Sequence, residues 1–141
     1  MEDVVRARWL DGLVFEAEDG EGHTVRMDTS AEHGGGSAIR PVTMLLVSLV
    51  GCTAMDVVAI LEKKRQKLTS FETVVRGERA EEHPKKYTHI QVEYIVRGQG
   101  IDPAAVERAI DLSVTKYCSV QASLDPRIEV THTFRIEEEP A

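Results

Sequence analysis

Cysteine is scarce in this sequence, and acidic residues outnumber basic ones. The 141 residues include only two cysteines, and the formal net charge is −7. Aromatic residues make up 5% of the chain and no dense Lys/Arg block is present, which argues against a nucleic-acid-binding surface. The Cys-x-x-Cys and His-Glu-x-x-His patterns are also missing, so the usual zinc motifs are excluded. We therefore expect no nucleic-acid partner, no metal and no cofactor.

The first residues carry acids, Glu2 and Asp3, with no apolar run behind them. This is not the pattern of a secretory signal, so we expect a cytoplasmic protein with reduced thiols. Apolar residues make up 42% of the chain and charged residues 29%, as in globular proteins. The length suits one domain covering residues 1–141.

One segment resembles a membrane span. Residues 42–61 contain a single charged residue, Asp56, and a bilayer requires about 20 apolar residues. A charge inside the bilayer is costly, however, and Thr43, Ser48 and Thr53 add polar interruptions. A helix that is apolar on all sides also occurs in the core of a soluble protein, and we expect that outcome, without a membrane partner.

Hydrophobic patterning predicts three N-terminal strands at residues 4–10, 13–17 and 23–28, followed by a helix from Pro41 to about Gln66. Two long strands are expected at residues 71–79 and 87–97. A second helix follows Asp102-Pro103, a typical N-cap and first-turn proline. The last strand covers residues 127–136, and Glu137-Glu138-Glu139 is expected to be a solvated tail. The order βββ-α-ββ-α-β indicates an α+β domain.

Cys52 lies in the middle of the long predicted helix. Residues three and four positions apart share a helix face, so Ser48, Cys52 and Asp56 should line up. A buried thiol often acts only as a small apolar residue. The polar stripe in an otherwise apolar helix favours a functional site instead.

A reactive cysteine needs a lowered pKa, and Asp56 on the same face would raise it. Arg40 is the nearest arginine before Cys52, but it would lie about 18 Å away along one helix at roughly 1.5 Å per residue. It would then serve Cys52 only from a second subunit. Arg6, Arg8 and Arg26 in the N-terminal strands are further candidates.

Cys118 comes at the end of the second predicted helix, beside Lys116 and Tyr117. Its alternatives are a core thiol and the second member of a redox pair. The five histidines are scattered through predicted strands and turns. His33-Gly34-Gly35-Gly36 is similar to an esterase oxyanion loop, but no Gly-x-Ser-x-Gly accompanies it. We interpret that segment as a loop.

Two stretches resemble motifs of the OsmC/Ohr family, named for osmotically inducible protein C and organic hydroperoxide resistance. They are Leu49-Val50-Gly51-Cys52-Thr53-Ala54-Met55-Asp56-Val57 and Lys116-Tyr117-Cys118-Ser119-Val120. Between them, residues 76–79 and 83–88 are similar to the strand pair that joins the family's two helices. The resemblance covers about residues 4–136.

The resemblance implies an intertwined homodimer with a long buried central helix in each subunit. It also implies a thiol peroxidase that reduces hydroperoxides, preferably organic ones. Cys52 would attack the peroxide and become a sulfenic acid, and Cys118 would resolve it as a disulfide that a dithiol reductant reopens. Arg40, or an arginine of the N-terminal strands, would stabilise the thiolate.

The sequence departs from the family pattern near Pro41. Typical members carry a glutamate just after this proline, where it holds the activating arginine, and here Val42 and Thr43 occupy the turn. The chain thus resembles a divergent branch. Two alternatives follow: a non-catalytic member that binds a small apolar or acyl ligand, and a redox sensor.

Overall fold

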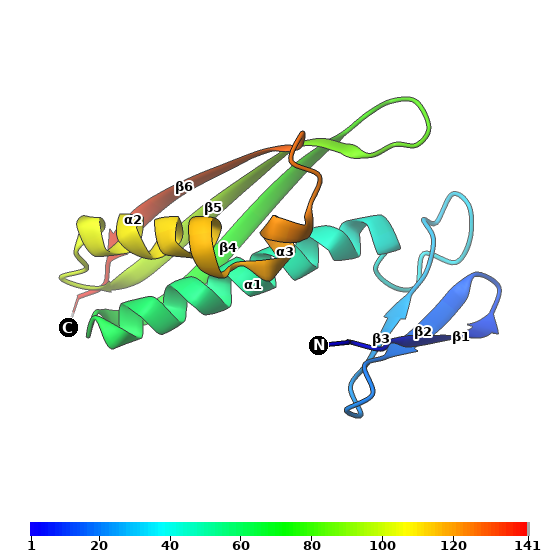
Figure 1. Ribbon diagram of the computed structural model, residues 1–141, viewed down its shortest axis with the longest axis horizontal. Helices are drawn as coiled ribbons and strands as arrows, with labels where there is room; N and C mark the ends of the chain where they lie inside the picture. The colour runs from blue at the N-terminus through cyan, green and yellow to red at the C-terminus, as the bar shows by residue number, and fades with distance from the viewer. Residues whose placement is uncertain (141) are drawn as a thin grey trace. The chain divides into compact units, whose positions relative to one another are not determined.

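The computed structural model describes residues 1–140 and divides into two compact units, one ending at Leu45 and the other beginning at Leu46 (Figure 1). The first unit contains three strands: β1 (Arg6–Asp11), β2 (Val14–Glu18) and β3 (Thr24–Met27). A long helix, α1 (Pro41–Lys63), leads into the second unit. The remaining elements are β4 (Lys67–Arg79), β5 (Tyr87–Gln99), α2 (Pro103–Leu112), η1 (Ser113–Tyr117), α3 (Ser119–Ser123) and β6 (Glu129–Glu138). The predicted α+β class and the order βββ-α-ββ-α-β are confirmed.

The first unit is an antiparallel meander in the order β1-β2-β3. Gly12 adopts a positive φ of 50° in the tight turn between β1 and β2, and its carbonyl accepts a 2.9 Å hydrogen bond from the Trp9 indole. Apolar side chains of the meander remain in solvent, with Trp9 66% and Phe15 39% exposed. The sheet therefore presents apolar surface that the chain itself leaves uncovered.

Helix α1 begins as predicted at Pro41, where the missing N–H of proline costs no hydrogen bond. The helix ends at Lys63, three residues before the expected end. Arg65 adopts a left-handed φ of 57°, and the amides of Arg65 and Gln66 bond back to Glu62 and Leu61. These paired bonds form a Schellman motif, which satisfies the last carbonyls and turns the chain into β4.

The second unit has a three-stranded sheet in the order β4-β5-β6, with β4 antiparallel and β6 parallel to β5. Alternate residues of β5 are fully buried on one face, and both α1 and α2 lie on the same side of the sheet (Figure 1). The buried side chains of that strand are Ile90, Val92, Tyr94 and Val96. The core of this unit therefore lies between the helices and one sheet face.

The opposite sheet face carries ion pairs. Arg97 contacts Glu72 at 3.5 Å and Glu137 at 2.7 Å, and Arg135 contacts Glu137 at 3.1 Å. The prediction that residues 137–139 form a solvated tail was wrong for Glu137 and Glu138, which belong to β6. Cross-strand charge pairing extends the strand beyond its last apolar residue.

Helix α1 is long and apolar enough to cross a membrane by length and composition. Its buried residues instead form one stripe along the helix: Leu46, Leu49, Thr53, Val57 and Leu61. The stripe packs on the sheet. Leu46 Cδ1 lies so close to Gly77 of β4 that a Cβ added to this glycine would be only 3.1 Å away from it. The helix is thus the central helix of a soluble fold rather than a membrane span.

Candidate functional site

The two cysteines meet in the second unit. The sulfurs of Cys52 and Cys118 and a carboxylate oxygen of Asp56 all lie within 4.8 Å of one another. Cys52 and Asp56 come from successive turns of α1, whereas Cys118 lies between η1 and α3. Both cysteines are free thiols. Residues 66 positions apart in sequence are therefore brought within a short movement of a disulfide, whose Cα atoms lie roughly 4.4–6.8 Å apart.

A π-helical turn places Cys118. Segment η1 follows α2 directly, and the Cys118 amide donates a 2.7 Å hydrogen bond to the Ser113 carbonyl, five residues earlier. Cys118 then acts as the N-cap of α3, its sulfur accepting a 3.3 Å hydrogen bond from the Gln121 amide. Turns of this kind interrupt α-helices frequently at functional sites. Here the turn changes the chain direction so that the sulfur faces α1.

Asp56 is held from the other side of the site. The Ser113 hydroxyl donates a 2.9 Å hydrogen bond to Asp56 Oδ2, and Ser113 is fully buried. The first residue of the π turn is thereby tied to α1, one turn beyond Cys52. This contact and the turn together tie the segment that carries Cys118 to the helix that carries Cys52.

The two thiols differ in exposure. Cys118 is only 3% exposed, and burial raises its pKa to about 11, with a further contribution from the neighbouring Cys52 thiol. Cys52 is half-buried. At neutral pH Cys118 is therefore a protonated thiol without direct access to solvent. An incoming reagent reaches Cys52 first.

A buried polar chain supports the Cys118 turn. The Tyr94 hydroxyl lies 2.9 Å from His132 Nδ1, and His132 Nε2 lies 2.9 Å from Gln121 Oε1. Since Gln121 Oε1 only accepts, Nε2 carries the proton and Nδ1 accepts from Tyr94. Burial raises the pKa of Tyr94 to about 12 and lowers the pKa of His132. Both residues therefore stay neutral at pH 7. They link the sheet to Gln121, whose backbone amide donates to the Cys118 sulfur.

The predicted alignment of Cys52 with Asp56 agrees with this site, and the expected proximity of Cys52 and Cys118 is confirmed. The catalytic roles of Cys52 and Cys118 stay predictions. Arg40 belongs to the first unit, where its carbonyl accepts from the Met44 amide at the start of α1; its role as an activating residue also stays a prediction.

Sequence reasoning missed four residues of the site: Ser113 as a partner of Asp56, and Tyr94, His132 and Gln121. The sequence did contain one indication of His132. This histidine occupies an inward position of an alternating strand whose other inward residues are Val130, Phe134 and Ile136. A histidine at such a position is expected to have a buried partner.

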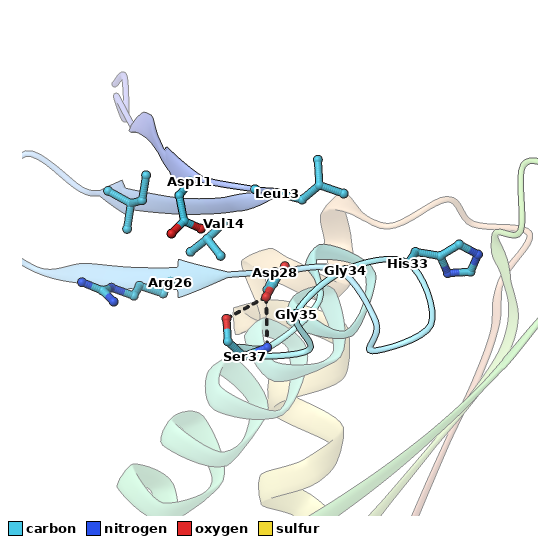
Figure 2. A pocket seen from close by; sticks show the side chains of 11 residues that line it. Asp11, Leu13, Val14, Arg26, Asp28, His33, Gly34, Gly35 and Ser37 are labelled. Carbon is cyan, nitrogen blue, oxygen red and sulfur yellow. Dashed lines mark hydrogen bonds between the residues drawn. The ribbon is translucent and has the colours of Figure 1, made fainter.

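A separate hollow lies in the first unit (Figure 2). It has a volume of about 520 Å³ and is lined by residues that include Arg26, Asp28 and the His33-Gly34-Gly35 segment. The Asp28 carboxylate is already bonded, since Oδ2 accepts from the Ser37 amide at 3.0 Å and hydroxyl at 2.6 Å. These bonds lower its pKa. Asp28 thus organises the loop, in agreement with the loop interpretation of this segment.

Relatives of the chain have similar length and fold. Protein YhfA of Escherichia coli strain K12 is 41% identical over 131 residues, which cover 93% of this chain and 96% of YhfA. A crystal structure of a hypothetical protein from Aquifex aeolicus VF5 is 27% identical, covers 99% of each chain and has a TM-score of 0.88. The organic hydroperoxide resistance protein OhrB of Bacillus subtilis shares the fold at 13% identity, with 96% of this chain and 98% of that chain covered and a TM-score of 0.62.

The family description "OsmC-like protein" matches residues 34–133, a range that includes both cysteines, Asp56 and His132. The resemblance seen in the two cysteine motifs is therefore confirmed over most of the chain. The chain belongs to the OsmC-like protein family.

Proposed function

We propose that this protein is a thiol-dependent reductase of organic hydroperoxides. The observation that carries the proposal is the pair of free thiols within 4.8 Å of each other, one half-buried and one fully covered. Unequal exposure suits unequal roles, with Cys52 as the attacking residue and Cys118 as the resolving residue. The fold that the chain shares with a protein named for organic hydroperoxide resistance supports the same substrate class.

The reaction requires no cofactor. The Cys52 thiolate attacks one peroxide oxygen, the O–O bond breaks, and the alcohol leaves with a proton, which produces a sulfenic acid on Cys52. The Cys118 sulfur then attacks the oxidised sulfur, and water leaves as the disulfide forms. A dithiol reductant restores both thiols by exchange and is itself oxidised to a disulfide.

The first step requires the Cys52 thiolate, which a nearby cation would stabilise. Arg40 is one candidate. Arg8 and Arg26 are further candidates, because each forms an ion pair with Glu16, at 3.3 and 3.4 Å respectively. Glu16 would then replace the carboxylate that is missing after Pro41. Each arginine would act on Cys52 after assembly of the dimer.

The proposal includes an intertwined homodimer of single-domain subunits. Helix α1 leaves apolar side chains in solvent, with Met55 75% and Val47 44% exposed. The meander does the same with Trp9. Exposed apolar surface of this extent normally marks an interface. In the proposed dimer, a second copy of the chain covers these side chains. We place the protein in the cytoplasm, where dithiol reductants are present.

A redox sensor is the second candidate, favoured by the environment of Cys118. Cys118 is only 3% exposed, and burial raises its pKa to about 11. A disulfide formed with this covered sulfur would be hard for a reductant to reach and would persist. In that case the protein would form one disulfide per chain but would not turn over.

Steady-state consumption of cumene hydroperoxide with dithiothreitol tests the proposal. Wild type should show multiple turnovers, and Cys52→Ser should show none, because no other nucleophile occupies that position. Cys118→Ser should react once and leave a sulfenic acid that a dimedone-type probe labels. The arginine variants are Arg8→Ala, Arg26→Ala and Arg40→Ala. Substitution of the arginine that activates Cys52 should lower the rate of peroxide consumption about tenfold or more. A wild type that consumes no peroxide refutes the enzyme proposal.

A further inference from the structure

Three potential metal-binding atoms converge at the junction of α1 and η1. They are the sulfurs of Cys52 and Cys118 and a carboxylate oxygen of Asp56, all within 4.8 Å of one another. Two thiolates and a carboxylate form a donor set that suits Zn²⁺, which is bound by Cys sulfur at about 2.3 Å and by Asp oxygen at about 2.0–2.2 Å. Two such ligands on a tetrahedral ion lie roughly 3.5–3.8 Å apart. Side-chain rotations that move the donor atoms by about 1 Å would bring them to this spacing.

The donor atoms are also oriented by hydrogen bonds. Ser113 donates to Asp56 Oδ2 at 2.9 Å, and the Gln121 amide donates to the Cys118 sulfur at 3.3 Å. Outer contacts of this kind fix ligand orientation at metal sites and contribute substantially to affinity. Ser113 and Gln121 would thus support two of the three metal ligands from behind.

Exposure of the three residues determines which side of the ion would be open. Cys118 is 3% exposed, whereas Cys52 and Asp56 are half-buried. An ion held by all three would be closed on the Cys118 side and more open on the side of Cys52 and Asp56. Three protein ligands with one open position are typical of exchangeable or catalytic zinc rather than of closed structural sites.

We propose that Cys52, Asp56 and Cys118 form a binding site for a thiophilic divalent cation, with Zn²⁺ as the best-fitting ion. The proposal goes beyond peroxide reduction and does not depend on it. Binding would consume both thiols as ligands and release their protons. The zinc form would therefore resist oxidation and alkylation, and zinc and peroxide would compete for the same sulfurs.

A search for sequence motifs would not find this site. Its ligands come from an i, i+4 pair on α1 and from a cysteine 62 positions after Asp56. Known zinc motifs detect short local spacings such as Cys-x-x-Cys. The absence of those motifs argued against a metal, but the π turn creates the donor set from residues that are distant in sequence.

Competition with a chromophoric chelator tests the site in reduced, metal-free protein without peroxide. We expect one Zn²⁺ per chain in wild type, no binding in Cys52→Ser, and at least about tenfold weaker binding in Asp56→Asn. Asp19, Glu21 and His23 form an exposed cluster of similar donor spacing in the first unit. His23→Gln is therefore the matched control, and it should bind Zn²⁺ like wild type.

Two further measurements keep the test informative if a cysteine variant folds poorly. Co²⁺ should produce thiolate-to-metal charge-transfer absorption in wild type, and Zn²⁺ should slow alkylation of Cys52. Absence of Zn²⁺ binding in wild type overturns the proposal, as does full binding in both Cys52→Ser and Asp56→Asn. Peroxide turnover measured separately with chelator present reports on the reductase proposal alone, so the two failures are distinguishable.

Discussion

The Ser113 hydroxyl donates a 2.9 Å hydrogen bond to Asp56 Oδ2 and so joins the end of α2 to the middle of α1. Ser113 also accepts the Cys118 amide through its carbonyl, across the π turn. One residue therefore links the helix that carries Cys52 with the turn that carries Cys118. The distance between the two sulfurs depends on this link.

Ser113→Ala should lower the free energy of unfolding by about 1–2 kcal/mol, because Asp56 loses a hydrogen-bond donor in a half-buried position. Urea unfolding followed by circular dichroism measures the change. Ser119→Ala is the matched control, since Ser119 is exposed, and it should shift stability by less than about 0.5 kcal/mol. Equal losses in the two variants would contradict the structural role of the Ser113–Asp56 bond.

The pH dependence of stability should reveal His132. Burial lowers its pKa in the folded protein, so the unfolded chain, with an ordinary pKa of about 6.5, binds the proton first as pH falls. The stability that the neutral ring contributes is present above that value and is lost below it. Wild type should therefore lose more unfolding free energy between pH 7 and pH 5 than His132→Gln, which keeps a donor and an acceptor. Parallel pH profiles would contradict the assignment.

The two cysteines should react with an alkylating agent in a fixed order. Cys118 is covered and its pKa is raised to about 11, whereas Cys52 is half-buried. Limited treatment with iodoacetamide at pH 8, followed by peptide mass spectrometry, should find Cys52 modified first, about tenfold faster or more. Prior unfolding in urea should equalise the rates. Faster labelling of Cys118 in the folded protein would reverse the proposed roles.

A charge on the exposed side of α1 should break the dimer. Met55 is 75% exposed in the single chain, and Met55→Glu would place a charge in the proposed interface, where an unpaired charge is costly. Sedimentation velocity should find wild type dimeric and this variant monomeric or unfolded at micromolar concentration. Gln91→Glu adds the same charge at an exposed site on β5 and should remain dimeric. A stable, folded wild-type monomer would refute the dimer.

Much of the fold was predictable because its signals are local. Pro41 marks the start of α1, and alternation marks the strands. The errors lie at element ends. The Schellman turn at Arg65 shortened α1, and ion pairs between Arg97 and Glu137 lengthened β6. Both effects depend on backbone conformation or on a partner strand, which local patterns do not contain.

Local spacing predicted the candidate site only on α1, and the pairing with Cys118 came from the family resemblance. The i, i+4 spacing places Cys52 beside Asp56, but the π turn has no comparable sequence pattern. Its five-residue hydrogen bond from Cys118 to Ser113 determines which way the sulfur points. The Tyr94–His132 contact joins two strands, and the His132–Gln121 contact crosses from the sheet to α3. Such contacts exist only after the sheet and helices have assembled.

The most direct test of the account is a single-turnover experiment on the two thiols. Reduced wild type is mixed with one equivalent of cumene hydroperoxide, and free thiols and peptides are then analysed. We expect the loss of two thiols per chain and one linked peptide pair joining Cys52 to Cys118. Retention of both thiols, or a disulfide that joins two Cys52 residues instead, would contradict it.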